Sequence, residues 1–283
     1  MNFLATSIEE DVVDTSAIVK ALLVRTGGFV PLDESTYKVK KIVAALNESQ
    51  VPPPDVLDVV VCPSADYMDL VRGSLRGDFQ IAAEIHAPSP AECLGIRNDD
   101  VFTWQYLSKS LSEESIPWVI LGTSKRRVSL NESNTFVGEK VVYVLDQCGM
   151  KVIACVGETC RQREAGETMD VISAQTKAIA AERVTNWENV VLAYDPAWAT
   201  GTGKVVTPPQ VQEVHSEIRK CLEASVNAEV ASMTRIICAV PLTSKNCPEL
   251  AAQSDVDGFL VRGAPLKPEF IGILMSATTQ DEA

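Results

Sequence analysis

The sequence predicts an α/β protein that folds as a single (β/α)8 barrel. The chain has 283 residues, of which 46% are hydrophobic, and a barrel of this class typically takes about 250 residues. Short β-branched apolar runs alternate with amphipathic stretches, a pattern typical of parallel βαβ units. Eight such runs occur in the chain, and eight strands close a barrel.

The predicted strands, in chain order, are Ala21 to Val24, Leu57 to Cys62, Gln80 to Ile85, Trp118 to Leu121, Lys151 to Val156, Val190 to Tyr194, Arg235 to Val240 and Asp257 to Val261. We therefore assign residues 21–276 to the barrel. Residues 1–20 are predicted to be an N-terminal extension, whose order the sequence leaves open, and residues 277–283 a C-terminal tail.

Two of the intervening helices carry clear end signals. Pro208 and Pro209 open a stretch that runs past His215 to Ala224, and proline suits the first turn of a helix. A second helix is predicted from Asn134 to Gly149, where glycine can adopt the left-handed conformation that ends a helix.

Composition excludes several functional classes. The formal net charge is −13, which repels nucleic acid. No apolar run approaches the roughly 20 residues of a membrane span, and the acidic N-terminus does not resemble a transit peptide. The eight cysteines include no C-x-x-C pair. We expect a cytoplasmic protein with reduced thiols, without a metal or cofactor and without a nucleic-acid or membrane partner.

Several long motifs resemble triosephosphate isomerase. WVILGTSKRR (Trp118 to Arg127) matches the end of that family's fourth strand, except that Thr123 replaces a histidine. The other matching motifs are VIACVGE (Val152 to Glu158), REAGET (Arg163 to Thr168), AYDPAWATGTGK (Ala193 to Lys204), TPPQVQEVH (Thr207 to His215) and DVDGFLVRGAPLKPEF (Asp255 to Phe270). The resemblance covers about residues 21–274 and implies a TIM barrel related to an isomerase of glycolysis and gluconeogenesis.

The resemblance also shows that three catalytic positions are substituted. Interconversion of an aldose and a ketose phosphate requires a carboxylate base, a hydrogen-bond donor to the enediolate oxygens and a nearby cation. The base position falls at Asp195, which is one methylene shorter than the family's glutamate. The electrophile position falls at Thr123, and the position of the family's lysine falls at Pro31.

The phosphate site that the resemblance implies is substituted as well. Gly201 lies in the hinge end of a lid loop, and Arg262-Gly263 stands where the family has two glycines. After the seventh strand, Cys238 to Pro241 replaces a glycine-rich turn, so side chains occupy the space where backbone would approach phosphate. We expect Arg262 to plug this site rather than to bind the ligand, so a small phosphorylated metabolite would bind weakly if at all.

The neighbouring charged residues have both structural and functional interpretations. Arg126 and Glu132 match family positions that form a structural ion pair. Lys125 replaces a glutamate, and we expect its side chain to face solvent rather than to supply the missing cation.

The main hypothesis is therefore a catalytically inactive member of the family with a binding or structural role. One alternative is a weak triose-phosphate isomerase with Asp195 as base; another is a barrel adapted to a different metabolite through Cys238, Arg262 and Lys125. Phe102-Thr103 matches the family's dimerisation loop, although Trp104 and Gln105 depart from it. The expected partner is a second copy of the chain or an active paralogue.

Overall fold

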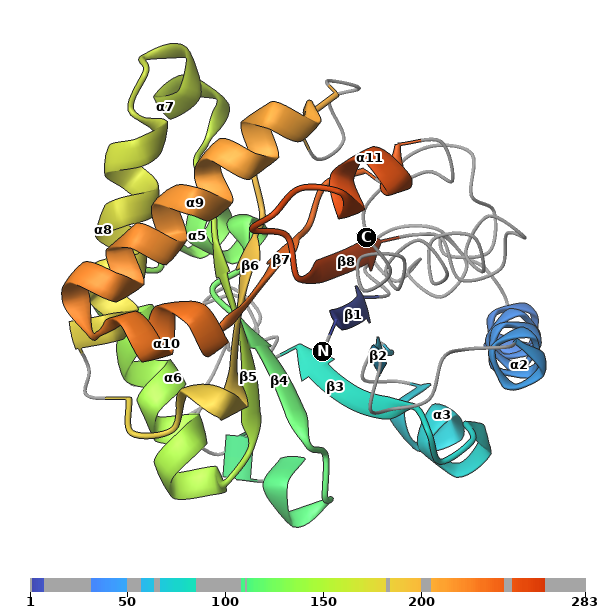
Figure 1. Cartoon of the computed structure of the whole chain (residues 1–283). Helices are drawn as coiled ribbons and strands as arrows, with labels where there is room; N and C mark the ends of the chain where they lie inside the picture. Colours follow the sequence, from blue (N-terminus) through green and yellow to red (C-terminus); the bar gives the residue numbers. More distant parts are fainter. Residues whose placement is uncertain are drawn as a thin grey trace. The chain divides into compact units, whose positions relative to one another are not determined.

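The computed structural model describes residues 2–7, 32–49, 57–63, 67–84, 108–109, 111–181, 184–199, 205–241 and 246–262. Eight parallel strands follow one another in chain order, β1 to β8, with the topology of a closed barrel. This topology confirms the predicted fold class. The chain divides into two compact parts (Figure 1), and each is described separately.

The first part comprises residues 1–81, 198–216 and 235–283. Its strands are β1 (Asn2–Ser7), β2 (Leu57–Cys62), β7 (Arg235–Cys238), β8 (Gly258–Arg262) and the beginning of β3 (Gln80–Glu84). Its helices are α2 (Leu32–Glu48), α3 (Met68–Ser74), α11 (Cys247–Ala251) and the beginning of α9 (Pro208–Ser225). The order of pairing in this part is β7, β8, β1, β2, β3.

The first strand corrects the prediction from sequence. The strand is Asn2–Ser7, inside the predicted extension, whereas residues 21–24 lie outside the described residues. Asn2 to Ser7 pair along their whole length with Leu57 to Cys62 of β2, and Phe3 to Ser7 pair with β8. Apolar content alone favoured Ala21 to Val24, but hydrogen bonding to two neighbouring strands selects the barrel strand.

The second part comprises residues 82–197 and 217–234. It holds the end of β3 together with β4 (Trp118–Leu121), β5 (Lys151–Val156) and β6 (Val190–Tyr194). Its helical segments are α5 (Ser124–Leu130), α6 (Asn134–Cys148), α7 (Cys160–Glu164), α8 (Thr168–Ala181), the 3-10 turn η2 (Trp187–Asn189), α10 (Ala228–Met233) and the end of α9.

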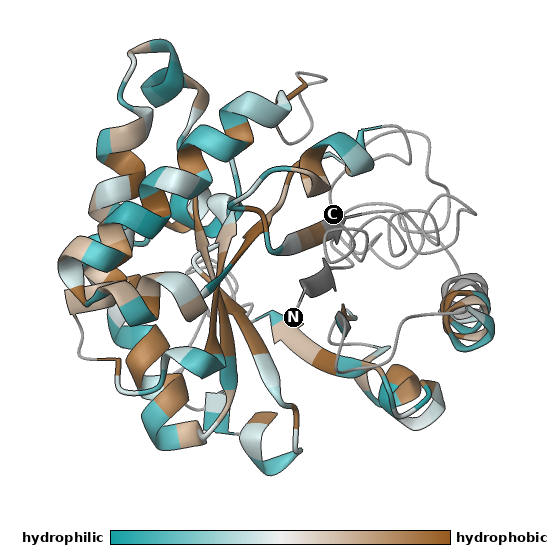
Figure 2. Cartoon of the chain, in the orientation of Figure 1, coloured by the Kyte–Doolittle hydropathy of each residue, from teal (hydrophilic) through white to brown (hydrophobic). Residues whose placement is uncertain are grey.

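The core of the second part lies along its strands. Every residue of β4 and β6 is buried, and Figure 2 shows these strands as hydrophobic while the helices expose hydrophilic faces. Helices α6 and α8 contact each other and both contact β5. Strands covered on both faces are expected to be continuously apolar rather than alternating, which is why they were recognisable in the sequence.

Helix α6 shows how local sequence sets an element's ends. Ser133 accepts a hydrogen bond from the Phe136 amide at 3.1 Å and so caps the N-terminus. Gly149 ends the helix with φ of 63°, a conformation that costs glycine little.

Among the described residues, no helix is long and apolar enough to cross a membrane.

Candidate active site

Asp195 lies directly after β6, and the structure holds its carboxylate in a defined place. The residue is completely buried. Its Oδ2 atom accepts a hydrogen bond from the Ser124 amide at 2.8 Å, and its own amide donates to the Val156 carbonyl at 2.8 Å. Backbone hydrogen bonds to the ends of β4 and β5 therefore fix the position and direction of this acid.

Gly157, directly after β5, packs against the backbone of Asp195. A Cβ atom added to Gly157 would lie 1.9 Å from the Asp195 carbonyl oxygen, so no other residue fits without movement. The Gln175 side chain from α8 holds Gly157 through two hydrogen bonds, accepting from its amide at 2.7 Å and donating to its carbonyl at 3.0 Å. These two buried hydrogen bonds hold the backbone of Gly157 in place, and the backbone of Asp195 packs against it.

Thr123, the residue at the electrophile position, has only 1% of its surface exposed. Its hydroxyl donates a hydrogen bond to Oε1 of Glu84, at the end of β3, at 3.1 Å. A threonine hydroxyl carries a single proton, so this bond uses the donor that an enediolate oxygen would need. Glu84 thereby adds a carboxylate next to Thr123.

The structure thus brings two of the predicted catalytic positions to one place. Ser124, which holds the Asp195 carboxylate, is the next residue after Thr123. The two residues follow β4 and β6, which both pair with β5. Because parallel strands end at the same edge, this edge carries the chemistry in barrels of this class.

A buried ion-pair cluster supports helix α5 next to the site. Oε1 of Glu132 accepts hydrogen bonds from Arg126 at 2.6 and 3.0 Å and from Lys140 at 2.5 Å. Burial disfavours the charged carboxylate, but the hydrogen bonds and charges of Arg126 and Lys140 outweigh burial, so the pKa of Glu132 lies below its ordinary value. Sequence analysis assigned the Arg126–Glu132 pair but missed Lys140, which lies on α6.

The buried residue Glu158 connects the segments that follow β5 and β6. Glu158 is completely buried, and its Oε1 accepts from Arg163 at 2.9 Å and from the Tyr194 hydroxyl at 3.1 Å. The Glu158 carbonyl accepts from the Ala197 amide at 3.1 Å. The chain that continues from Asp195 is therefore tied to the REAGET motif, which contains Arg163.

Several predicted site residues lie outside the part of the chain that the structure describes in full. Pro31, Gly201 and Gly263 lie outside the described residues, and Arg262 is placed by its backbone alone, opposite Ser7 in the β1–β8 ladder. The assignment of Pro31 depended on a first strand at residues 21–24. With β1 at Asn2–Ser7, the chain that directly follows the first strand reads Ile8-Glu9-Glu10-Asp11 and contains no lysine.

The remaining predicted residues have clear environments. Lys125 is exposed. Cys238, at the end of β7, is buried, and burial raises the pKa of its thiol to about 12, so it is a poor nucleophile. Among the described residues, no group of His, Cys, Asp and Glu side chains has the arrangement of a metal site.

Comparisons with known proteins agree with this architecture. The model of the triosephosphate isomerase family matches residues 32–277. The cytosolic triosephosphate isomerase of Oryza sativa subsp. japonica is 54% identical over 254 residues, which cover 90% of this chain and 96% of the relative. The cytosolic enzyme of Stellaria longipes is 43% identical over 91% of this chain and 97% of its own. The chloroplastic enzyme of Secale cereale is 41% identical over 90% and 82%.

Proposed function

Because the chain belongs to the triosephosphate isomerase family, we propose that it is a triose-phosphate isomerase of low turnover, with the Asp195 carboxylate as its base. The reaction is the interconversion of glyceraldehyde 3-phosphate and dihydroxyacetone phosphate in glycolysis and gluconeogenesis. The observation that carries the proposal is the buried Asp195 carboxylate, held by the Ser124 amide at 2.8 Å. The names of the full-length relatives support this activity better than the hypothesis of an inactive protein.

In the proposed step, a carboxylate oxygen of Asp195 removes the proton from the carbon next to the substrate carbonyl and returns it to the neighbouring carbon. The electron pair of the broken C–H bond forms the carbon–carbon double bond of the enediolate, and the π pair of the carbonyl moves onto its oxygen. As the neighbouring carbon is reprotonated, the hydroxyl proton of the substrate passes to the former carbonyl oxygen, so the carbonyl and hydroxyl groups exchange places. Catalysis then depends on the donors that stabilise the enediolate oxygen.

The low turnover has two physical causes. Aspartate withdraws the base by one methylene, and a displacement of about 1 Å can cost roughly 10²-fold in rate. The Thr123 hydroxyl is bonded to Glu84 at 3.1 Å, and loss of one oxyanion donor costs roughly 10²- to 10³-fold. Together these changes would lower kcat by about 10⁴- to 10⁵-fold relative to an enzyme with both groups, if the effects were additive.

A second candidate function is a family member that binds a partner or ligand without turnover. Two observations favour it: the Thr123–Glu84 hydrogen bond and the acidic sequence Ile8-Glu9-Glu10-Asp11 after β1, where the family's lysine would follow. An enediolate next to the Glu84 carboxylate would be destabilised by like charge.

A coupled assay with glyceraldehyde 3-phosphate separates the two candidates. The chain should be produced in a host that lacks its own isomerase and compared with Asp195→Asn and Asp195→Glu. We expect measurable turnover that falls at least about 10²-fold in Asp195→Asn and rises in Asp195→Glu. If Asp195→Asn turned over as fast as the unmodified chain, Asp195 would not be the base. If none of the three proteins showed any turnover, the binding role would be favoured.

We further propose that the protein acts in the cytosol and as a dimer, either with itself or with an active paralogue. The rice relative that is 54% identical is named cytosolic, although chloroplastic relatives are 41% and 43% identical. Fluorescence microscopy of a fusion carrying the reporter at its C-terminus tests the compartment. Analytical ultracentrifugation of the chain alone, and mixed with the paralogue, tests the assembly.

A further inference from the structure

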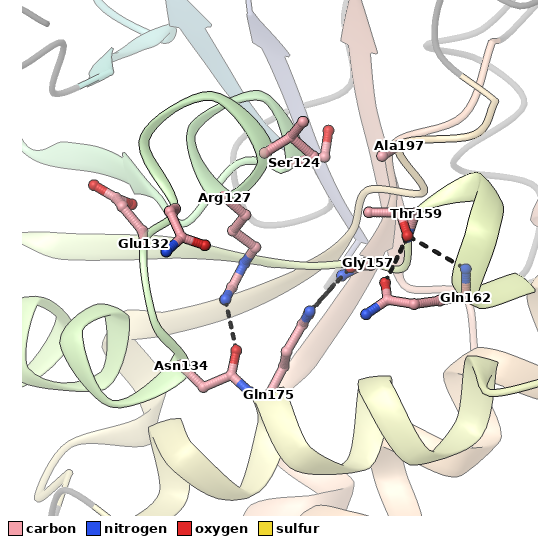
Figure 3. Close-up of a pocket in the computed structure, with 11 residues that line it drawn as sticks. Ser124, Arg127, Glu132, Asn134, Gly157, Thr159, Gln162, Gln175 and Ala197 are labelled. Atoms are coloured by element: carbon pink, nitrogen blue, oxygen red, sulfur yellow. Dashed lines mark hydrogen bonds between the residues drawn. The ribbon is translucent and has the colours of Figure 1, made fainter.

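The second part of the chain contains a cavity that borders Asp195 and that the proposed reaction does not use. Its volume is about 320 Å³, and two of its walls are Ser124 and Gly157, the residues that position Asp195. Figure 3 shows the cavity between helix α5 and the start of α6 on one side and helices α7 and α8 on the other. Its polar side chains come from Ser124, Arg127, Asn131, Glu132, Asn134, Thr159, Gln162 and Gln175.

Arg127 brings a positive charge to this cavity, and its hydrogen bonds in the described part of the chain do not go to a carboxylate. Its guanidinium donates to the Gly122 carbonyl at 2.8 Å, to Asn134 Oδ1 at 2.9 Å and to the Cys155 carbonyl at 3.2 Å. All three acceptors are neutral, and among the described residues no carboxylate forms an ion pair with Arg127. Burial lowers the pKa of this guanidinium, as expected where desolvation of a cation is incompletely offset.

Several unused hydrogen-bonding groups around Arg127 are donors. A guanidinium has five N–H groups, of which the three bonds above use three. Asn134 Oδ1 is occupied by Arg127, and Gln162 Oε1 accepts from the Thr159 amide and hydroxyl, both at 2.9 Å. In the described part of the chain, the NH₂ groups of Asn134 and Gln162 therefore keep their protons for a ligand.

Glu132 also lines the cavity; its Oε1 atom is paired with two cations, whereas its Oε2 atom has no hydrogen-bond partner among the described residues. Its carboxylate binds both Arg126 and Lys140. Arg126, Arg127 and Lys140 thus bring three cations to this region, against the two carboxylates of Glu132 and Asp195. A surplus of positive charge combined with unused N–H donors favours an acceptor-rich, negatively charged ligand.

We propose that this cavity binds a small organic anion through a carboxylate or phosphate group. Arg127 supplies the charge, and the side-chain amides of Asn134 and Gln162 donate hydrogen bonds. A volume of about 320 Å³ corresponds to roughly ten water molecules at about 30 Å³ each, which is sufficient for a small metabolite.

Calorimetric titration of the full chain with citrate and with inorganic phosphate, at constant ionic strength set with chloride, tests the proposal. Comparison of the two probes tells which oxyanion the cavity prefers. Val128 lines the cavity and its side chain is 60% exposed, so Val128→Glu and Val128→Gln form a matched pair that differs in charge with little effect on folding. We expect Val128→Glu to bind the preferred anion about 3- to 10-fold more weakly than Val128→Gln.

Arg127→Gln is the direct variant, and we expect it to weaken binding by at least about tenfold. Because Arg127 also donates hydrogen bonds to two backbone carbonyls, circular dichroism must first show that Arg127→Gln is folded. If Arg127→Gln does not fold, the Val128 pair still tests the proposal. Equal affinity in Val128→Glu and Val128→Gln would overturn the proposal, as would the absence of binding by both probes. Binding that responds to Asp195→Asn but not to the Val128 pair would place the anion at the candidate active site and would also overturn it.

Discussion

Replacing Glu132 by glutamine tests whether the buried charges of Arg126, Glu132 and Lys140 stabilise the protein. The exposed fractions of the three side chains are 9%, 4% and 2%, so solvent screens them little. Glutamine keeps the shape of the side chain but removes the negative charge between two cations. Removing one partner from a buried ion pair typically costs about 3–5 kcal/mol, and we expect a loss in that range at pH 7.

A second substitution separates the charge effect from packing. Lys140→Met alone leaves the Arg126–Glu132 pair in place, with hydrogen bonds at 2.6 and 3.0 Å. In the Glu132→Gln background, Lys140→Met removes one of the two cations that have lost their anion. We therefore expect the double variant to be more stable than Glu132→Gln alone, by about 1–2 kcal/mol.

The pH dependence provides a further check. The pKa of Glu132 is lowered in the folded protein, so the unfolded chain binds more protons than the folded one as the pH falls through its unfolded pKa of about 4.3. The contribution of Glu132 is therefore fully present above that pKa and is lost as the pH drops through the folded pKa. We expect the free energy of unfolding to fall more steeply below about pH 5 in the unmodified chain than in Glu132→Gln.

Urea unfolding followed by circular dichroism measures these differences, and Glu139→Gln is the matched control because Glu139 lies exposed on the same helix as Lys140. The control should change stability by no more than about 0.5 kcal/mol. The reasoning would be refuted if Glu132→Gln were no less stable than this control, or if Lys140→Met made the Glu132→Gln protein less stable still.

Three further predictions concern the residues around Asp195 and β7. Gly157→Ala should destabilise the protein by more than about 2 kcal/mol, measured by urea unfolding, because its Cβ would lie 1.9 Å from the Asp195 carbonyl oxygen; a smaller loss would show that the loop can move. Gln175→Met should cost about 1–3 kcal/mol in the same measurement, since it removes two buried hydrogen bonds to Gly157, and a neutral result would contradict their importance. With a pKa of about 12, Cys238 should resist iodoacetamide at pH 8 in the native protein and react after denaturation, as residue-level mass spectrometry can establish; rapid native labelling would argue against its burial.

The comparison of sequence with structure shows where local signals suffice. Val190 to Tyr194 was recognisable as a strand because both of its faces are buried, which requires apolar residues at every position. Asp195 and Thr123 were found because each lies within two residues of the end of such a strand, inside a long motif. The first strand was missed because the apolar run in Asn2–Ser7 is only three residues long and its assignment depends on pairing with β2 and β8.

The amino-acid sequence alone determined the barrel class, the family and the identity of the residues at the base and electrophile positions, because apolar periodicity and contiguous motifs are local properties of a chain. Only the tertiary structure decided which groups those residues meet. Glu84 reaches Thr123 from 39 positions away, and Lys140 on α6 joins Glu132 in the connection that precedes this helix. Such contacts depend on strand order and helix packing, which place distant side chains within hydrogen-bonding distance.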